Sequence, residues 1–307
     1  MIRRVPTWVL LATVAAISGG CVVRNGVRNK VVVPQSQKPV ARDASRKELL
    51  DLYNQIARGI KTLNATVELT PIAGSTYSGV IVEYHEVKAF LLAARPAQIR
   101  MIGQAPVIGK TVFDMSSDGD TFRVLIPSKN KFLVGPVAVE RNSSKPIENL
   151  RPQHLLDALL WPEIRKEEAV YLKEFNDENA RYYVLAVLRG GYQVEILREI
   201  WFDRSDLHVA RTQTFGPKGL LLSDVHLADW RPIENAPSQN TPAAPADGVT
   251  SFPRAIRLER PHDDYKLDLQ VTKISLNDEI PAERFKLEQP AGTELVQVSD
   301  GAESKQP

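Results

Sequence analysis

The sequence predicts a mainly β (α+β) fold: one large, curved antiparallel sheet, or incomplete β-barrel, of about 10–11 strands with two helices on its concave side. Stretches in which apolar and polar residues alternate occupy most of the chain after residue 80. Asp118-Gly119 and Gly190-Gly191 lie between such stretches and are typical of hairpin turns. Only two segments show helical spacing, so a long sheet must curl around few helices.

The first helix is expected at the start of the folded region. Ser45 and, three residues later, Glu48 form a capping box. Apolar residues then recur at helical spacing: Leu49, Leu52, Tyr53, Ile56, Ile60 and Leu63. One face of this helix is therefore apolar, and we expect it to pack against the sheet.

The strands are expected in runs rich in β-branched and aromatic residues. The first two runs span residues 80–85 and 89–102, and only Pro96 interrupts the second. The remaining runs are 112–115, 122–126, 170–175, 183–188, 194–202, 207–215, 220–230, 255–260 and 265–276.

A second helix separates these strands into two groups. Pro152 suits its first turn, and Pro162 ends it. Its apolar face consists of four leucines: Leu155, Leu156, Leu159 and Leu160. We expect this helix, like the first, to cover part of the concave side of the sheet.

The N-terminus has the layout of a signal peptide. Arg3 and Arg4 precede an apolar run over residues 8–17, about half of the ~20 residues that a membrane-spanning helix needs. Three small residues, 18–20, lead directly to Cys21, the single cysteine of the chain, so no internal disulfide is possible. This layout favours cleavage before Cys21. The segment also resembles the lipobox of bacterial lipoproteins, and that resemblance implies lipidation of the Cys21 thiol; the alternative is ordinary secretion with a free thiol.

The predicted domain organisation is a signal peptide (1–20), a lipidated cysteine with a flexible tether (21–42), a single β-domain (43–298) and a disordered tail (299–307). Within the domain, the Pro/Ala-rich segment 234–248 is typical of a disordered loop. Two of the 39 Lys and Arg residues lie in the signal peptide, so the remaining 37 balance the 37 Asp and Glu residues. This balance argues against a nucleic-acid-binding surface.

Catalytic and metal-binding motifs are missing from the sequence. The five histidines are His85, His154, His208, His226 and His262, and no two of them have the close spacing of a local zinc motif. The chain also lacks the G-x-S-x-G, G-x-G-x-x-G and G-x-x-x-x-G-K-[ST] patterns. We therefore expect no enzyme, no metal and no cofactor. A hydrolase built from scattered residues is the alternative that remains.

Three stretches resemble the LolA/LolB superfamily of periplasmic lipoprotein carriers, most closely the outer-membrane receptor LolB: residues 99–109 (IRMIGQAPVIG), 155–161 (LLDALLW) and 285–290 (FKLEQP). The segment before Cys21 resembles the lipobox of bacterial lipoproteins. The resemblance implies acyl chains such as palmitate on Cys21, anchorage in the outer membrane facing the periplasm, and receipt of lipid or lipoprotein cargo from a periplasmic carrier protein. The alternative is a protein-binding sensor or scaffold lipoprotein of the cell envelope, as in RseB of that superfamily.

Two sets of apolar residues are candidate contacts for a hydrophobic ligand. Val107 and Ile108 lie at a strand-to-strand corner, where polar side chains are usual, so they either protrude as an apolar loop or fold under the sheet edge. The second set is expected to line the concave face: Phe90, Leu92, Met101, Phe113, Phe122, Val124, Leu185 and Leu222. Strand periodicity is compatible with an open cavity there and equally with a filled core.

Overall fold

A single large sheet dominates the structure, a computed structural model that describes residues 40–75, 78–138, 149–177, 180–191, 194–233 and 249–298. These residues belong to one unit, which begins at Val40. The predicted signal peptide, Cys21 with the tether up to residue 39, the loop 234–248 and the tail 299–307 lie outside the described residues.

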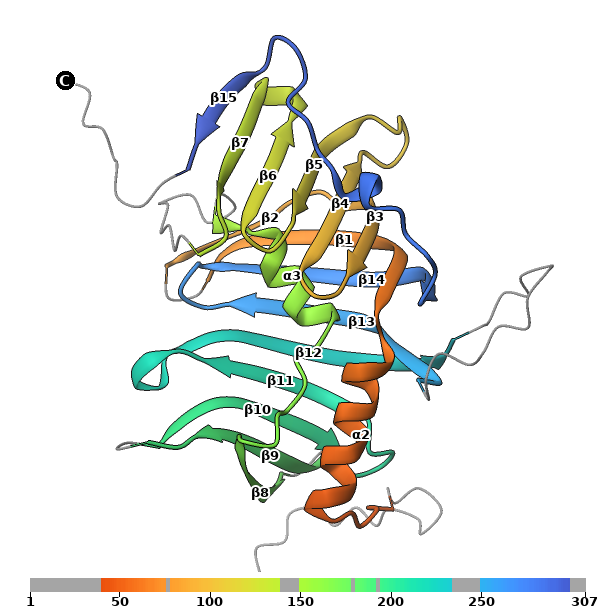
Figure 1. The fold of residues 1–307 in the computed structure, drawn as a ribbon, viewed down its shortest axis with the longest axis vertical. Coiled ribbons are helices and arrows are strands. Elements are labelled where there is room, and N and C mark those ends of the chain that lie inside the picture. Colours follow the sequence, from red (N-terminus) through yellow and green to blue (C-terminus); the bar gives the residue numbers. More distant parts are fainter. Residues whose placement is uncertain are drawn as a thin grey trace, which may run out of the picture. The chain divides into compact units, whose positions relative to one another are not determined.

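The described part of the chain contains fifteen strands, which Figure 1 shows as one continuous sheet. They are β1 (Thr62–Ser75), β2 (Val80–Glu83), β3 (Val87–Ala94), β4 (Gln98–Gln104), β5 (Thr111–Ser117), β6 (Thr121–Ile126), β7 (Lys131–Pro136), β8 (Ala169–Asn176), β9 (Arg181–Arg189), β10 (Glu195–Asp203), β11 (Val209–Phe215), β12 (Leu221–Pro232), β13 (Ser251–Arg260), β14 (Tyr265–Leu276) and β15 (Glu294–Gln297). Their order in the sheet is β15-β7-β6-β5-β4-β3-β1-β14-β13-β12-β11-β10-β9-β8, and β2 pairs with β1. Every pair except β15 with β7 is antiparallel.

The predicted mainly β fold with one large, curved, open sheet and two helices is confirmed, with corrections to the strands. The structure has fifteen strands rather than the expected about 10–11. The sequence pattern misses β1 because Pro71 and Gly74 interrupt it and because Leu63 fits the helical spacing of the preceding segment. It also misses β7 and the short β15. The run 89–102 is two strands, because the chain turns at residues 95–97.

The first helix, α2 (Arg46–Gly59), has the predicted capping box. The Ser45 hydroxyl accepts a hydrogen bond from the Glu48 N–H at 3.3 Å, and the Ser45 N–H donates to the Glu48 carboxylate at 2.7 Å. Leu49, Tyr53 and Ala57 form its buried face. The helix ends one turn earlier than predicted: Ile60 is its C-cap, and Leu63 belongs to β1.

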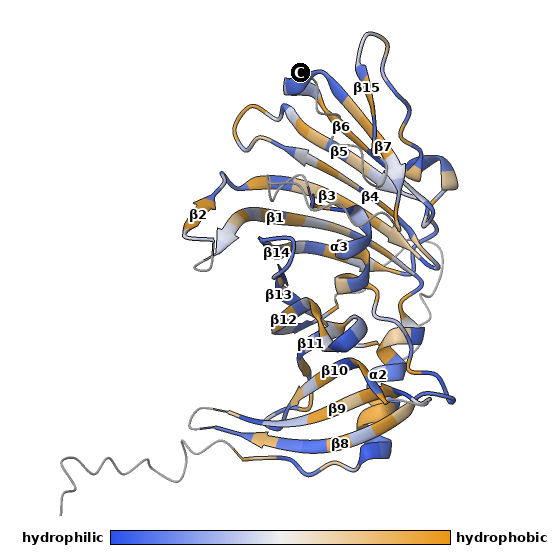
Figure 2. Cartoon of the chain, turned by 90° about the vertical axis from the view of Figure 1, so that its left-hand side faces the viewer, coloured by the Kyte–Doolittle hydropathy of each residue, from blue (hydrophilic) through white to orange (hydrophobic). Residues whose placement is uncertain are grey.

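The second helix, α3 (Pro152–Leu159), begins at the predicted proline and buries Leu155, Leu156 and Leu159. Both helices lie inside the bend of the sheet in Figure 2, and their buried side chains join the strands in one hydrophobic core. Tyr53 of α2 stacks on Trp161, with ring centroids 5.8 Å apart, and thereby links α2 to the segment that directly follows α3. No helix in the described residues has the length and apolar character needed to cross a membrane.

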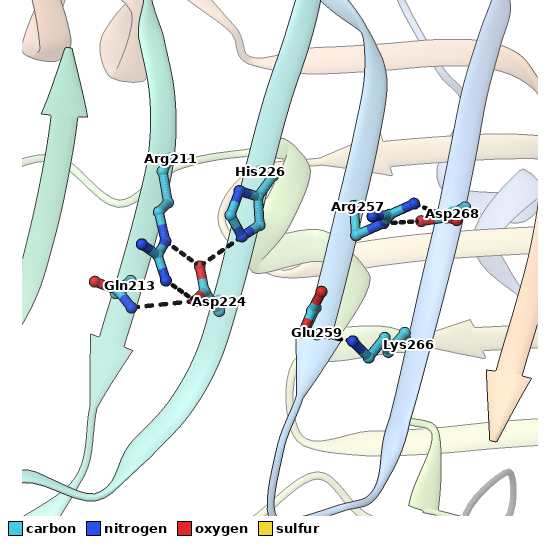
Figure 3. A network of polar contacts seen from close by, with 8 residues as sticks. All are labelled: Arg211, Gln213, Asp224, His226, Arg257, Glu259, Lys266 and Asp268. Atoms are coloured by element: carbon cyan, nitrogen blue, oxygen red, sulfur yellow. Dashed lines mark hydrogen bonds and ion pairs between the residues drawn. The ribbon is translucent and has the colours of Figure 1, made fainter. Parts of the chain in front are cut away.

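The outer face of the sheet carries charged and polar side chains across β11–β14. Figure 3 shows the ion pairs that join neighbouring strands from β11 to β14. Arg211 pairs with Asp224, which also accepts a hydrogen bond from the Gln213 amide at 3.1 Å. Arg257 pairs with Asp268 at 2.6 Å. These contacts give polar partners to the Asp224 carboxylate and the Gln213 amide, which are both buried, and they join neighbouring strands.

Candidate hydrophobic ligand site

An apolar cavity of about 520 Å³ lies against the inner face of the sheet, where β1, β3, β5–β7 and β14 meet the start of α3. This volume falls within the roughly 300–1,000 Å³ of typical small-molecule sites. The side chains at its inner end come from β5, β6, β7 and α3: Phe113, Met115, Phe122, Val124, Leu133 and Leu155. Since almost every lining group in this part is a hydrocarbon or an aromatic ring, the cavity suits an apolar ligand.

The shape of one cavity wall depends on a glycine. Gly103 of β4 lies opposite Phe113 of β5 in the register of the two strands. A Cβ atom on Gly103 would come within 2.3 Å of the Phe113 ring, far closer than van der Waals contact. Glycine therefore lets the Phe113 ring lie flat over the backbone of β4, and a larger residue would push the ring out of this position.

The inner end of the cavity meets the beginning of α3. The Arg151 side chain, which is buried, lies over the Phe122 ring at 4.7 Å from its centroid, a favourable cation–π geometry. Leu155, one turn into α3, is fully buried and closes the cavity toward the core. The position of this helix therefore sets how deep the cavity extends.

The mouth of the cavity lies at the segment that connects β2 to β3. Tyr84, His85 and Glu86, which join these two strands, line it together with Ala105 and Pro106 from the β4–β5 turn. The Tyr84 N–H donates to the Pro71 carbonyl at 2.9 Å, so the chain stays close to β1 although the strand is interrupted. This interruption leaves an opening at the edge of the concave face.

Val107 and Ile108 protrude beside this mouth. The turn that carries them is closed by two backbone hydrogen bonds, from the Ala105 N–H to the Lys110 carbonyl at 2.8 Å and from the Gly109 N–H to the Ala105 carbonyl at 3.1 Å. Val107 is fully exposed and Ile108 is 74% exposed. Of the two alternatives drawn from the sequence, the structure shows the protruding loop; a role in ligand transfer stays a prediction.

The structure places six of the eight predicted concave-face residues in three different environments. Phe113, Phe122 and Val124 line the cavity. Met101 and Leu185 face the same side but are fully buried within the core. Leu222 is half-buried beside Gly216 at the turn between β11 and β12, away from the cavity.

Phe90 and Leu92 lie on the outer face of β3, which corrects their predicted placement. Phe90 is 40% exposed, and Leu92 packs against Phe285 in a separate small cluster. The pattern of β3 is ambiguous because both of its faces carry apolar residues. On its outer face, Phe285 of the 3-10 helix Ala282–Phe285 covers Leu92 but leaves Phe90 exposed. The sequence reasoning also missed Met115, which shares a strand face with Phe113 and was identifiable by its spacing.

A histidine and a tyrosine fix α3 against β14 near the inner end of the cavity. The His154 Nδ1 atom and the Tyr265 hydroxyl oxygen are 2.5 Å apart, and the two rings stack. Burial, together with the charges of Arg260 and Arg151, lowers the pKa of His154 well below its ordinary value of 6.5. The imidazole is therefore neutral in the folded protein at neutral pH.

We expect His154 to make the folded protein less stable in mild acid. Below the ordinary histidine pKa of 6.5 the unfolded chain takes up a proton that the folded protein does not. The free energy of unfolding should therefore fall with decreasing pH, by at most about 1.4 kcal/mol per pH unit, and this contribution should be constant at higher pH. Urea unfolding of the wild type and His154→Gln over this range measures it; parallel losses in both proteins would contradict the prediction.

The described residues contain no cluster of three or more His, Cys, Asp or Glu side chains placed to hold a metal ion. The expectations that the chain is not an enzyme and needs no cofactor stay predictions. What the geometry provides is an apolar space with an opening and an apolar loop next to that opening.

The fold and the site together define an open, curved β-sheet protein with an apolar cavity beside the start of α3. No protein-family model matches the chain, and no curated protein sequence matches it significantly. Among solved structures, a LolA superfamily protein from Nitrosomonas europaea aligns with 13% identity and a TM-score of 0.46 over 80% of this chain and 99% of that one. A DUF1329 family protein from Desulfovibrio piger aligns with 12% identity and a TM-score of 0.48 over 78% and 96% of the two chains.

A domain from Vibrio parahaemolyticus assigned to outer membrane lipoprotein sorting aligns with 12% identity and a TM-score of 0.46 over 77% of this chain and 95% of that one. LolA-superfamily and lipoprotein-sorting structures are thus among the structural neighbours of this chain. At these identities and TM-scores the likeness carries no argument about function. The closer resemblance to LolB stays a prediction.

Proposed function

We propose that the protein binds the acyl chain of a lipid or lipoprotein in its concave cavity and acts by binding, without catalysis. The observation that carries the proposal is the cavity of about 520 Å³ with an apolar lining and an opening at one end. Each methylene group moved from water into such a space contributes about 0.8 kcal/mol. A long acyl chain therefore gains enough from burial to offset the cost of ordering it.

The N-terminal sequence supports a membrane surface as the location of this activity. Lipidation of Cys21 would hold the protein at a membrane surface, and two or more acyl chains would make that anchorage stable. We propose the outer membrane, facing the periplasm, as its location and lipid or lipoprotein transfer as its process. The residues after Cys21 would then act as a tether between the membrane and the β-domain.

The exposed loop suggests how a ligand passes between membrane and cavity. Val107 and Ile108 lie next to Ala105 and Pro106 in the cavity mouth, so an acyl chain leaving the membrane can contact exposed apolar side chains before it enters the cavity. We expect the double substitution Val107→Ser with Ile108→Ser to slow acyl transfer between vesicles and protein about tenfold. Because neither side chain lines the cavity, the equilibrium affinity for a fluorescent fatty acid should change little.

The function itself is tested by the lipid content of the purified protein and by uptake of a fluorescent fatty acid. We expect mass spectrometry to find co-purifying lipid and the fatty acid to bind with saturation. Absence of both would contradict the proposal and would favour the alternative of an envelope sensor or scaffold that binds proteins. Equal transfer rates for the wild type and the loop variant would contradict a role of Val107 and Ile108 in transfer, but not acyl binding in the cavity.

A further inference from the structure

A short strand with an unpaired edge lies directly beside the cavity mouth. β2 pairs with β1 on one side and with no other strand in the described residues. It leads through Tyr84 into the segment that lines the mouth. Unpaired strand edges present backbone N–H and C=O groups to which another extended chain can add.

The register of β1 and β2 shows which backbone groups are available. The Tyr84 N–H donates to the Pro71 carbonyl, and hydrogen-bonded and non-hydrogen-bonded pairs alternate along an antiparallel ladder. The pairs Ile72 with Glu83 and Gly74 with Ile81 are therefore of the non-hydrogen-bonded type. In agreement with this, the Gly74 N–H donates to the backbone carbonyl of Asp264, on the other side of β1, at 2.7 Å. The backbone N–H and C=O groups of Ile81 and Glu83 consequently point to the open edge.

The first three side chains of β2 are also exposed and apolar. Val80 is 62% exposed, Ile81 59% and Val82 44%. Val80 and Val82 share a face of the strand with Tyr84, whose side chain lines the cavity. The apolar surface of the cavity thus continues along one face of β2. The strand contains no lysine or proline, and its single charged residue is Glu83 at its end, so Val80, Ile81 and Val82 lack the features that commonly protect an edge from pairing.

We propose that the open edge of β2 binds the extended polypeptide segment to which a cavity-bound acyl chain is attached, that is, the N-terminal segment of an acylated protein. This inference rests on the proposed acyl-binding function and specifies its ligand. Only two residues of β2 offer outward backbone groups, too few to hold a free peptide. A peptide tied to an acyl chain in the adjacent cavity pairs at a high effective concentration, so a short edge suffices.

The substitution Ile81→Pro tests the open edge of β2 without removing the hydrogen bonds that hold β2 to β1. Proline removes the outward N–H of Ile81 and blocks an approaching strand, whereas the hydrogen bonds from β2 to β1 involve other residues of the strand. Ile81→Ala is the matched control, because it shortens the same side chain and keeps the N–H. Ile81 lines a hollow on the outer face rather than the cavity, so neither change alters the acyl site.

The test compares three probes on the full-length wild type and both variants by displacement of a fluorescent fatty acid: palmitate, a palmitoylated ten-residue peptide, and the same peptide with alternate backbone nitrogens methylated. We expect palmitate to bind all three proteins equally. The unmethylated lipopeptide should bind the wild type and Ile81→Ala roughly tenfold more tightly than the methylated one, as a few net backbone hydrogen bonds require. Ile81→Pro should lose this preference.

Hydrogen exchange gives a second readout: the amides of Ile81 and Glu83 should become protected when the unmethylated lipopeptide binds, and not with palmitate. A preference retained by Ile81→Pro, or equal binding of the two lipopeptides to the wild type, would overturn the edge proposal while palmitate binding still supports the acyl site. If palmitate binds none of the proteins, the acyl-binding function fails and the edge proposal fails with it.

Discussion

Replacing Val124 by tryptophan should remove most of the affinity for acyl chains. Val124 of β6 faces the cavity between Phe122 and Ile126, which also line it. An indole ring there occupies space that the ligand needs. If it displaces about three methylene groups, the loss is ~2.4 kcal/mol, roughly 60-fold in the dissociation constant. Titration with a fluorescent fatty acid measures the effect.

Leu125→Trp is the matched control for this experiment. Leu125 is the next residue of the same strand and points to the opposite face, outside the cavity. This control places the same tryptophan side chain on β6 and should leave fatty-acid affinity within about twofold of the wild type. If both variants bind as the wild type does, the ligand occupies another place. If both lose binding equally, the added bulk acts through the fold.

The sequence predicted the starts of both helices, because neighbouring residues determine where a helix begins. The capping box at Ser45 and Glu48 and the proline at the start of α3 are properties of a few neighbouring residues, and both helices begin where these signals place them. β1 was missed because its identity depends on partners far away in the sequence: it pairs with β14 as well as with β3. Such pairing overrides a weak local pattern that contains Pro71 and Gly74.

Part of the candidate site followed from strand periodicity, and the rest depended on tertiary packing. Phe113, Phe122 and Val124 line the cavity, as their alternation suggested. Phe90 and Leu92 were assigned to the wrong face because both faces of β3 carry apolar residues, and Phe285, which buries Leu92 on the outer face, comes from the C-terminal part of the chain. Leu185 is on the inner face, but it lies in the packed core, where α2 meets β9. Where the helices pack decides which parts of the concave face stay open.

The closure of the cavity by α3 leads to the largest expected change in stability. Leu155 is fully buried and lines the cavity, whereas Leu156, the next residue of α3, is equally buried and does not. Leu155→Ala and Leu156→Ala should each lower the free energy of unfolding of the ligand-free protein by about 2–5 kcal/mol, because removing buried methyl groups leaves unfilled space. Urea unfolding of lipid-stripped protein measures both losses.

The two variants should differ once acyl chains are bound. The space left by Leu155→Ala adjoins the cavity, so a longer acyl chain can fill it, and each additional buried methylene group should regain about 0.8 kcal/mol. The space left by Leu156→Ala is separated from the cavity and cannot be filled in this way. Affinities for fatty acids of increasing length should therefore reach their maximum at a longer chain in Leu155→Ala, and at the wild-type length in Leu156→Ala. The same optimum in all three proteins would show that bound chains do not reach the end of the cavity that α3 closes.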